Sequence, residues 1–589
     1  MTHALMTDGY KTFHKSGLHN DITGLYGNFT NRHGKYSNLP DDSLGGVVFL
    51  GLQYFIIDTL MEGWNYSFFW EDKEEAIQNI KRILDPYLGI DYDAGHFEDL
   101  WELGYLPIEI KAVPEGTITP YGVAPLTIRS TIDGFPWLPL YIETVLSTEL
   151  WPMCTSATTA AHYLKNTKKY FAQAGLDQGM TPFMNHDFSM RGCFGKQAAA
   201  MSGFSHLAVG NLGTDTLPAI MFAEDYYFAD QEKELIGCSV KATEHSITTS
   251  FIATYAEEHG VSYFEAEVEY ARKLLRENPT GILSYVADSF DFWKFVEEGL
   301  PLLKDEILAR EGTFVIRPDS GDPVDILCGK DNKVINLESN YADLTIFETW
   351  EEWVRDDLHT RFHTELKSDP TNPFCNMTVY YKFGVLTYKV TYEPDLNRHD
   401  KTYYYIDNYG RFEDKFTFVE QESTCVDKGL IETLYDIFGG TQTEEGYKVL
   451  DSHIGAIYGD SITLDRQEQI YSKLMAKGFA PNVVLGVGSY SYQYVTRDTH
   501  GSAVKATAAF LNDGTVVNVC KDPKTDSNKK SAKGLLRLEE EDGKIVQYDE
   551  QTQLEEAQGL LETVYRNGKL LRETTLQEIR EKVASQLGA

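Results

Sequence analysis

The pattern of apolar positions changes near residue 151 and then repeats one unit to about residue 502. The unit is a short apolar run, a polar or glycine-bearing turn, and a stretch with apolar residues at helical spacing. Strand–turn–helix repeats of this kind are typical of α/β folds built on a parallel sheet. The turns are NHDFSMRG (185–192), GNLGTDT (210–216), TEHS (243–246), VADSFD (286–291), IRPDSG (316–321), YGDS (458–461) and GVGS (486–489).

These seven turns place Asp, Arg, His and Gly directly after apolar runs. The carboxyl ends of parallel strands lie at one edge of a sheet, because each crossover returns the chain to the opposite edge. In α/β barrels the active site lies at that edge. One such turn alone would be ordinary loop chemistry. Seven in one chain predict an α/β barrel whose active site is built from the turns.

Outside this region the chain has other patterns. Residues 106–131 alternate apolar and polar positions between Pro and Gly turns, which predicts antiparallel strands, and alternation returns from about residue 503. Residues 155–175 resemble a helix that a glycine ends, and residues 553–564 and 575–587 predict two amphipathic helices near the C-terminus.

The barrel pattern, over 151–327 and 428–502, is interrupted between 328 and 427. This segment is rich in Tyr and Phe and contains period-two runs such as NMTVYYKFGVLTYKVTYE (376–393), which predict an inserted antiparallel β element of two or three hairpins. Its aromatic run YYYIDNYG (403–410) has two interpretations, packing across strands or a platform on which bases stack.

The composition excludes several classes of partner. The formal net charge of −36 repels nucleic acid and anionic membrane surfaces, so we expect neither as a partner, and phosphate binding then requires a local cluster of cations and backbone amides. The first residues lack the pattern of a signal peptide, and no run is long and apolar enough to cross a membrane. The seven cysteines are scattered without a CxxC pair, as in a cytoplasmic protein with reduced thiols.

Two turns have residues suited to a phosphorylated sugar. In IRPDSG an apolar run leads to Arg317, which can bind phosphate, and to Asp319, which can accept hydrogen bonds from ribose hydroxyls. The alternative is a structural Arg–Asp pair. YGDS repeats the arrangement with Gly459 and Asp460.

Three further segments are candidates for binding or chemistry. The Gly488–Ser489 turn offers free backbone amides to a phosphate, and Arg497 and Lys505 follow at distances compatible with the same face; a plain tight turn is the alternative. His245 lies in a turn where a structural role is the usual one. The segment HDFSMRG offers Asp187, Phe188 and Arg191, and the Phe could stack on a flat ligand or belong to the core.

Together these motifs resemble one family. TDGYKTFH, LPIEIKAVPEG, YIETVL, HDFSMRG, GTDT, EHS, IRPDSG, YGD and TRD, followed by KDPKTDSNKKSAKG, occur in the same order as in nicotinamide phosphoribosyltransferases. The resemblance covers nearly the whole chain except 328–427. It implies the type II phosphoribosyltransferase fold: an irregular α/β barrel plus a β-rich domain that the two chain ends, 1–150 and 503–589, form together. It also implies a homodimer whose active sites are completed by the partner chain.

The resemblance implies a role for each site residue. Phe188 lies beneath the nicotinamide ring, Tyr10 of the partner subunit lies above it, and Asp215 accepts the carboxamide NH2. His245 is phosphorylated when ATP, an activating co-substrate, is hydrolysed. The residues around the phosphoribosyl and phosphate groups are Arg191 and Arg317 at the pyrophosphate and ribosyl moiety, Asp319, Gly459 and Asp460 at the ribose hydroxyls, Gly488 and Ser489 at the 5′-phosphate, and Arg32, Arg497 and Lys505 around the phosphates.

The reaction expected from this resemblance joins nicotinamide to the ribose of phosphoribosyl pyrophosphate and releases pyrophosphate. No protein nucleophile is required, and Mg²⁺ would help to neutralise the leaving group. Two departures from the family are Ser489-Tyr490 where glycines are common, and the insertion. The rivals are a nicotinate phosphoribosyltransferase, which Asp215 disfavours because two carboxylates would face each other, and a non-catalytic phosphosugar- or nucleotide-binding protein.

Overall fold

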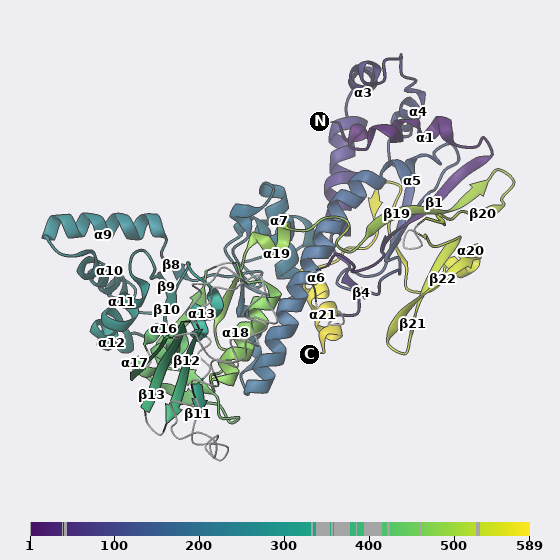
Figure 1. Ribbon diagram of the computed structural model, residues 1–589. Coiled ribbons are helices and arrows are strands. Elements are labelled where there is room, and N and C mark those ends of the chain that lie inside the picture. Colours follow the sequence, from purple (N-terminus) through teal and green to yellow (C-terminus); the bar gives the residue numbers. More distant parts are fainter. Residues whose placement is uncertain are drawn as a thin grey trace, which may run out of the picture.

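The computed structural model describes residues 2–37, 39, 44–330, 334–336, 354, 357, 377–383, 386–393, 415–420, 424–459, 461–525 and 530–588. Figure 1 shows a barrel domain beside a β-rich domain, with the long helix α6 (Glu143–Ala174) between them. Helix α6 ends at Gly175, whose φ of 68° is the left-handed conformation that ends helices. The glycine stop expected from 155–175 is confirmed.

Both ends of the chain contribute to the sheet of the β-rich domain. Its order is β20-β19-β1-β5-β3-β23-β24, and the pairings within it are antiparallel. The strands are β1 (Ile22–Asn31), β3 (Ile108–Ala112), β5 (Leu126–Ser130), β19 (Ser502–Leu511), β20 (Val516–Asn518), β23 (Glu562–Arg566) and β24 (Lys569–Leu570). Two small antiparallel pairs lie beside it, β2 (Val47–Val48) with β4 (Ile118–Thr119) and β21 (Leu535–Glu541) with β22 (Lys544–Gln551).

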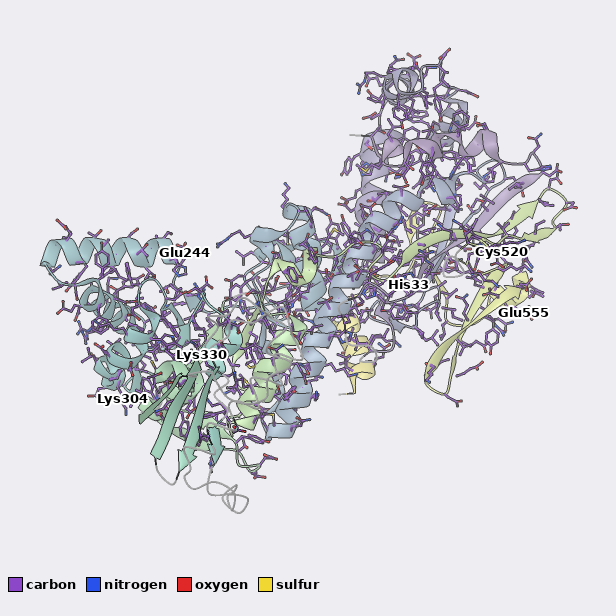
Figure 2. All side chains as sticks on the ribbon, viewed as in Figure 1. His33, Glu244, Lys304, Lys330, Cys520 and Glu555 are labelled. Carbon is purple, nitrogen blue, oxygen red and sulfur yellow. The ribbon has the colours of Figure 1, made fainter. Side chains whose placement is uncertain are left out.

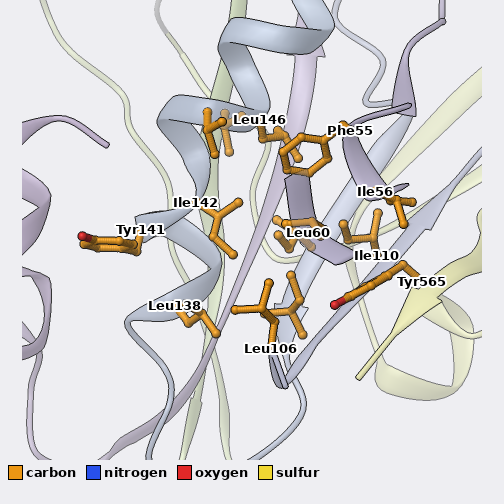
Figure 3. Packing of buried hydrophobic residues seen from close by; sticks show 14 of the residues in the cluster. Phe55, Ile56, Leu60, Leu106, Ile110, Leu138, Tyr141, Ile142, Leu146 and Tyr565 are labelled. Carbon is orange, nitrogen blue, oxygen red and sulfur yellow. The ribbon is translucent and has the colours of Figure 1, made fainter. Parts of the chain in front are cut away.

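Helices cover this sheet and supply its core. Figure 3 shows Phe55 and Leu60 from the π-helical segment η3 (Phe55–Gly63) packed against Ile110 of β3 and Ile142, which lies between two helices. These side chains are at most 2 % exposed, so the apolar area removed from water holds the domain together. The other helical segments of the domain are α1 (His14–Gly17), α2 (Leu52–Tyr54), α3 (Lys73–Leu88), α4 (Gly95–Leu103), α5 (Leu138–Tyr141), η1 (His3–Leu5), η2 (Gly9–Phe13), η4 (Asn65–Phe69) and α20 (Gln553–Glu556).

The second domain is built on a parallel sheet of order β7-β6-β18-β17-β10-β9-β8. A parallel bridge between Gly213 of β7 and Cys238, just before β8, joins the two edges and closes the sheet into an irregular barrel. The α/β barrel predicted from the turns is confirmed. The strands are β6 (Asn185–Asp187), β7 (Gly213–Thr214), β8 (Lys241–Ala242), β9 (Leu283–Val286), β10 (Phe314–Arg317), β17 (Ile454–Tyr458) and β18 (Val484–Val487).

Helices surround the barrel and bury its strands, since Tyr285, Phe314 and Leu485 have no exposed surface. They are α7 (Lys196–Ala208), α8 (Leu217–Tyr227), α9 (His245–His259), α10 (Tyr263–Glu277), α11 (Phe292–Lys294), α12 (Leu300–Leu308), α13 (Pro323–Cys328), α16 (Cys425–Lys428), α17 (Leu430–Phe438), α18 (Leu464–Ala476) and α19 (Ser489–Gln493), with η5 (Gln178–Phe183), η6 (Met190–Gly192), η7 (Phe295–Gly299) and the β15 (Gly440–Gln442)–β16 (Lys448–Leu450) pair.

Between α13 and α16 the described residues form a four-stranded sheet, β11-β12-β13-β14. Its strands are β11 (Val334–Asn336), β12 (Met377–Phe383), β13 (Leu386–Glu393) and β14 (Lys415–Glu420). Strands β12, β13 and β14 pair antiparallel, whereas β11 pairs parallel to β12. The aromatic run 403–410 lies outside the described residues.

The entry to and exit from this sheet meet at two glycines. A Cβ on Gly329 would lie 2.2 Å from the Asp427 carbonyl oxygen, and one on Gly429 would lie 2.1 Å from the Gly329 amide nitrogen. Both glycines have a φ of 82°, which other residues rarely adopt. Because Gly329 and Gly429 touch, the segment between them leaves and rejoins the barrel at one point. The helices on either side, α13 and α16, therefore stay together.

The C-terminal segment contains one correction. Residues 553–564, predicted as an amphipathic helix, form only the single turn α20 before the chain enters β23, which pairs with β3. Pairing at the sheet edge outweighs helical periodicity here. The last helix, α21 (Leu576–Leu587), is confirmed and begins with a capping box between Thr575 and Glu578. No helix in the described part of the chain is long and apolar enough to span a bilayer.

Candidate active site

The polar turns collect at the carboxyl edge of the barrel. Backbone hydrogen bonds continue the sheet just past the strand ends and hold neighbouring turns together. They run from Phe188 N to Val487 O (3.0 Å), Asp215 N to Asp187 O (2.9 Å), Thr243 N to Ser284 O (2.9 Å), Ala287 N to Arg317 O (3.0 Å) and Gly459 N to Pro318 O (3.3 Å). Residues from distant parts of the sequence therefore share one rim.

Asp215, after β7, presents an oriented carboxylate at this rim. Its Oδ1 accepts hydrogen bonds from His186 Nε2 at 2.9 Å and from Ser239 Oγ at 2.7 Å. Partial burial alone would raise the pKa of Asp215, but the bonds from His186 and Ser239 and the positive charge of Arg317 lower the pKa overall. The side chain is 43 % exposed, so an ionised acceptor faces the rim.

The aromatic ring of Phe188 lies against the histidine that bonds to Asp215. The Phe188 ring, after β6, is 4.5 Å from the His186 ring between centroids, at an angle of 34°. The turn is fixed from below by the fully buried Asp187, whose Oδ1 accepts from Ser189 N at 2.9 Å and whose Oδ2 accepts from Thr214 Oγ1 at 3.4 Å. Asp215 N also donates to Asp187 O, so the turns that carry Phe188 and Asp215 are adjacent.

A histidine and two carboxylates form a second group, after β8, β9 and β10. His245 Nε2 is 3.0 Å from Oδ1 of Asp288, whose side chain is only 6 % exposed, and His245 Nδ1 is 4.0 Å from Asp319 Oδ2. Asp288 Oδ2 accepts hydrogen bonds from Asp319 N at 3.2 Å and Ser320 Oγ at 2.6 Å. Asp288 thus fixes both the imidazole and the turn that carries Asp319.

Arg317, at the end of β10, points into the same rim. Its Nη2 donates to the Thr243 carbonyl oxygen at 2.9 Å, and its Nε is buried with no hydrogen-bond partner among the described residues. No ion pair joins Arg317 to Asp319 within the described part of the chain, so the alternative of a structural pair finds no support there. A guanidinium with an unsatisfied donor is suited to an anionic substrate.

The glycine turns allow close approach at the rim. A Cβ on Gly459 would lie 1.8 Å from Asp319 Oδ1, and one on Gly192 would lie 2.0 Å from Ser489 Oγ. The Gly488–Ser489 turn therefore sits against the turn of Arg191, whose side chain is exposed. Asp460 lies outside the described residues.

The remaining predicted residues form a separate group on the β-rich domain. Tyr10, Arg32, Arg497 and Lys505 line one cavity of about 400 Å³. Burial lowers the pKa of Lys505, and the charge of Arg32 acts in the same direction, while Glu143 opposes them. A bound anion would relieve this concentration of positive charge. Arg497 and Lys505 therefore lie with Tyr10 and not beside the Gly488 turn of the same chain.

The two groups are well separated within one chain. Figure 2 labels Glu244, next to His245, at one end of the barrel and His33, next to Arg32, in the other domain. The barrel rim carries the Phe188 ring, the Asp215 carboxylate and the His245–Asp288 pair, whereas the β-rich domain carries Tyr10 and three cations.

Sequence patterns missed three residues that organise the rim: His186, Ser239 and Asp288. His186 and Asp288 lie within turns that the pattern identified. The pattern could not show that His186 bonds to Asp215 and that Asp288 bonds to His245. Ser239 lies just before β8 and belongs to no recognisable motif. Its bond to Asp215 becomes apparent only in the folded barrel, where the segment before β8 lies beside β7.

Comparisons with known proteins identify the family of the chain. A sequence model of the nicotinate phosphoribosyltransferase (NAPRTase) family matches residues 183–392 and 386–569. A nicotinamide phosphoribosyltransferase of Acinetobacter baylyi is 38 % identical over 98 % of this chain and 96 % of the relative. One of Xanthomonas campestris is 30 % identical over 92 % of this chain and 91 % of the relative. Among solved structures, a nicotinate-nucleotide pyrophosphorylase from Pyrococcus furiosus aligns over 100 % of this chain and 96 % of that one, with 14 % identity and a TM-score of 0.46.

An α/β barrel whose strand-end turns carry an oriented acid, a histidine and an arginine has the architecture of an enzyme with its active site at that edge. The chain belongs to the nicotinate phosphoribosyltransferase (NAPRTase) family. It is a pentosyltransferase.

The contact between Gly459 and Asp319 leads to a first prediction. Gly459→Ala should displace the Asp319 carboxylate and lower kcat/KM for phosphoribosyl transfer by roughly tenfold, since misplaced positioning groups cost rate. Steady-state kinetics and Tm should be measured beside Gly455→Ala on β17, the strand that precedes Gly459, where a Cβ meets only ordinary contacts at 3.4 Å or more. Equal activity in the two variants would refute the positioning role of Asp319.

Proposed function

We propose that this enzyme transfers the 5-phosphoribosyl group of phosphoribosyl pyrophosphate to nicotinamide, giving nicotinamide mononucleotide and pyrophosphate in NAD salvage. The observation that carries the proposal is the ionised Asp215 carboxylate beside Phe188, with Oδ1 already bonded to His186 and Ser239. A carboxylate accepts hydrogen bonds from a carboxamide NH2 and repels the carboxylate of nicotinate. The nicotinamide phosphoribosyltransferases among the relatives point to the same base.

The chemistry requires orientation and charge neutralisation. The pyridine nitrogen of nicotinamide forms the new bond to C1 of the ribose as the bond from C1 to pyrophosphate breaks, and the electron pair leaves with pyrophosphate. Phe188 and Asp215 orient the base, and Asp319 binds the ribose hydroxyls with Gly459 and Asp460. Arg317 and Arg191 stabilise the leaving charge, and the Gly488–Ser489 amides hold the 5′-phosphate.

Mg²⁺ fits this rim as a partner of the substrate. No group of three or more His, Cys, Asp or Glu side chains converges as a metal cage among the described residues. Magnesium prefers oxygen ligands, keeps several waters, and takes one or two carboxylates beside substrate phosphates. Asp288 and Asp319 are two carboxylates at this edge that could bind the ion. The ion would supply positive charge at the pyrophosphate.

We also propose a homodimer in which the cavity of one subunit faces the barrel rim of the other. Tyr10, matched to the aromatic above the base, is 70 % exposed, and Phe194, just beyond the Arg191 turn, is 88 % exposed. Exposed aromatic side chains next to both the cavity and the barrel rim, the two halves of the proposed site, favour a protein interface. Docking a second copy there would bring Tyr10, Arg32, Arg497 and Lys505 to the substrate that Phe188 and Arg317 hold.

A product assay tests the function. Purified enzyme is incubated with phosphoribosyl pyrophosphate, Mg²⁺ and either nicotinamide or nicotinate, and the mononucleotides are separated and quantified. The proposal requires nicotinamide mononucleotide as the preferred product. A preference for nicotinate would favour the rival transferase, and no product with either base would favour a binding protein.

ATP coupling gives a second prediction. His245 is held by Asp288 with Nδ1 towards Asp319 at the open rim, which suits a residue that accepts a phosphoryl group from ATP. His245→Ala should keep basal transfer but lose ATP hydrolysis and its stimulation of product formation. His259→Ala, at the exposed far end of the same helix, should retain both. Full stimulation in His245→Ala would remove the phosphohistidine from the proposal.

A further inference from the structure

We infer that His186 is a positioning residue that, together with Ser239, turns one oxygen of Asp215 towards the base and so sets the preference for a neutral carboxamide over a carboxylate. The inference rests on the proposed function, because it concerns how the same acid distinguishes two bases. It assigns to the first residue of HDFSMRG a role that its sequence pattern does not suggest.

The hydrogen bonds at Asp215 are one-sided. His186 Nε2 at 2.9 Å and Ser239 Oγ at 2.7 Å both bond to Oδ1. Within the described residues no hydrogen bond reaches Oδ2. The two donors come from different segments, β6 and the segment before β8, and thereby fix the plane of the carboxylate. Oδ2 is left as the acceptor for a ligand at the rim.

The chemistry also fixes the state of the histidine nitrogen. An ionised Asp215 can only accept, so Nε2 of His186 carries the hydrogen. His186 is 7 % exposed, and its Nδ1 lies against β7, where a Cβ on Gly213 would be 2.7 Å away. The missing side chain at Gly213 therefore gives the imidazole room to lie beside the strand that carries Asp215.

His186 has a second contact that an experiment must separate from the first. The His186 ring lies 4.5 Å from the Phe188 ring, so removing it would disturb both the Asp215 carboxylate and the Phe188 ring. His186→Phe keeps a ring against Phe188 and removes the N–H. His186→Gln removes the ring and keeps an N–H donor that can reach Asp215.

The test is the ratio of kcat/KM for nicotinamide to that for nicotinate, together with the KM for phosphoribosyl pyrophosphate. His186→Phe should lower the ratio about tenfold or more, as expected for loss of a hydrogen bond to a charged group, with the phosphoribosyl pyrophosphate KM changed less than about twofold. His186→Gln should restore part of the ratio. Ser239→Ala should lower it in the same direction as His186→Phe.

A double-mutant cycle separates action through Asp215 from a general structural effect. In an Asp215→Asn background, His186→Phe should no longer lower the ratio but raise it, because His186 there holds the asparagine NH2 towards the base and its loss frees the amide to turn. His206→Gln is the matched control: this fully buried histidine bonds to Tyr492 and to the Gly213 carbonyl oxygen, so its loss should affect Tm and leave the ratio unchanged.

Each outcome decides a different claim. An unchanged ratio in His186→Phe, or independent effects of His186 and Asp215 in the cycle, would overturn the inference while the transferase activity stands. A wild-type enzyme that makes no nicotinamide mononucleotide would refute the proposed function and the inference with it. Both are supported if His186→Phe lowers the ratio, His186→Gln restores part of it, and His186→Phe no longer lowers it in the Asp215→Asn background.

Discussion

Asp215→Asn is expected to reverse the preference between the two bases. His186 and Ser239 both donate to the position of Oδ1, so they would hold the asparagine oxygen there and turn its NH2 towards the base. That NH2 would oppose the carboxamide NH2 of nicotinamide and would donate to the carboxylate of nicotinate. We expect kcat/KM for nicotinamide to fall by about a hundredfold or more, since a site with unpaired buried donors rejects its substrate strongly.

The measurement is the ratio of catalytic efficiencies for the two bases in the wild type and the variant. Asp225→Asn, exposed on α8, is the control for a change of charge alone and should keep the wild-type ratio. The KM for phosphoribosyl pyrophosphate should change little in both. If the ratio is the same in the wild type and Asp215→Asn, a residue other than Asp215 distinguishes the carboxamide from the carboxylate.

Mixing two inactive chains should restore activity if the active site is shared. Tyr10→Ala removes the proposed ring clamp and Asp215→Ala removes the acid, and each homodimer is expected to be almost inactive. In a mixed dimer one site combines intact Asp215 of one chain with intact Tyr10 of the other. After full exchange in an equal mixture, about a quarter of the wild-type activity should return.

The control for this experiment comes from the barrel rim itself. Asp215→Ala mixed with Arg317→Ala should remain inactive, because both residues lie in the same half-site and every mixed site lacks one of them. Activity in that control, or none in the first mixture despite demonstrated subunit exchange, would contradict the shared site.

Much of the barrel could be predicted from local signals. Apolar runs followed by polar turns identify the strand ends, and parallel topology then requires those ends to meet at one edge. Gly175 and the Thr575–Glu578 capping box mark helix ends by chemistry that operates within a few residues. The helix expected over 553–564 is absent because the partner of β23, strand β3, lies far away in the sequence and its pairing decides the structure.

The sequence indicated candidate residues for the site, but it could not indicate the partners of those residues. Asp215 and His245 occur in recognisable turns, whereas the bonds to His186 and Asp288 join positions 29 and 43 residues apart. Arg497 and Lys505 follow the Gly488 turn closely in sequence, yet the chain passes into β19 and carries them to the other domain. Closeness in the sequence therefore did not indicate that these residues lie in another domain.

The proposed nicotinamide site is built from the barrel rim of one subunit and the β-rich domain of another. A crystal structure with nicotinamide mononucleotide tests it most directly. We expect the pyridine ring between Phe188 and Tyr10 of the partner subunit, the carboxamide NH2 on Asp215 Oδ2, and the 5′-phosphate at Gly488–Ser489. A nucleotide bound away from Asp215, or a site complete within a single chain, would contradict it.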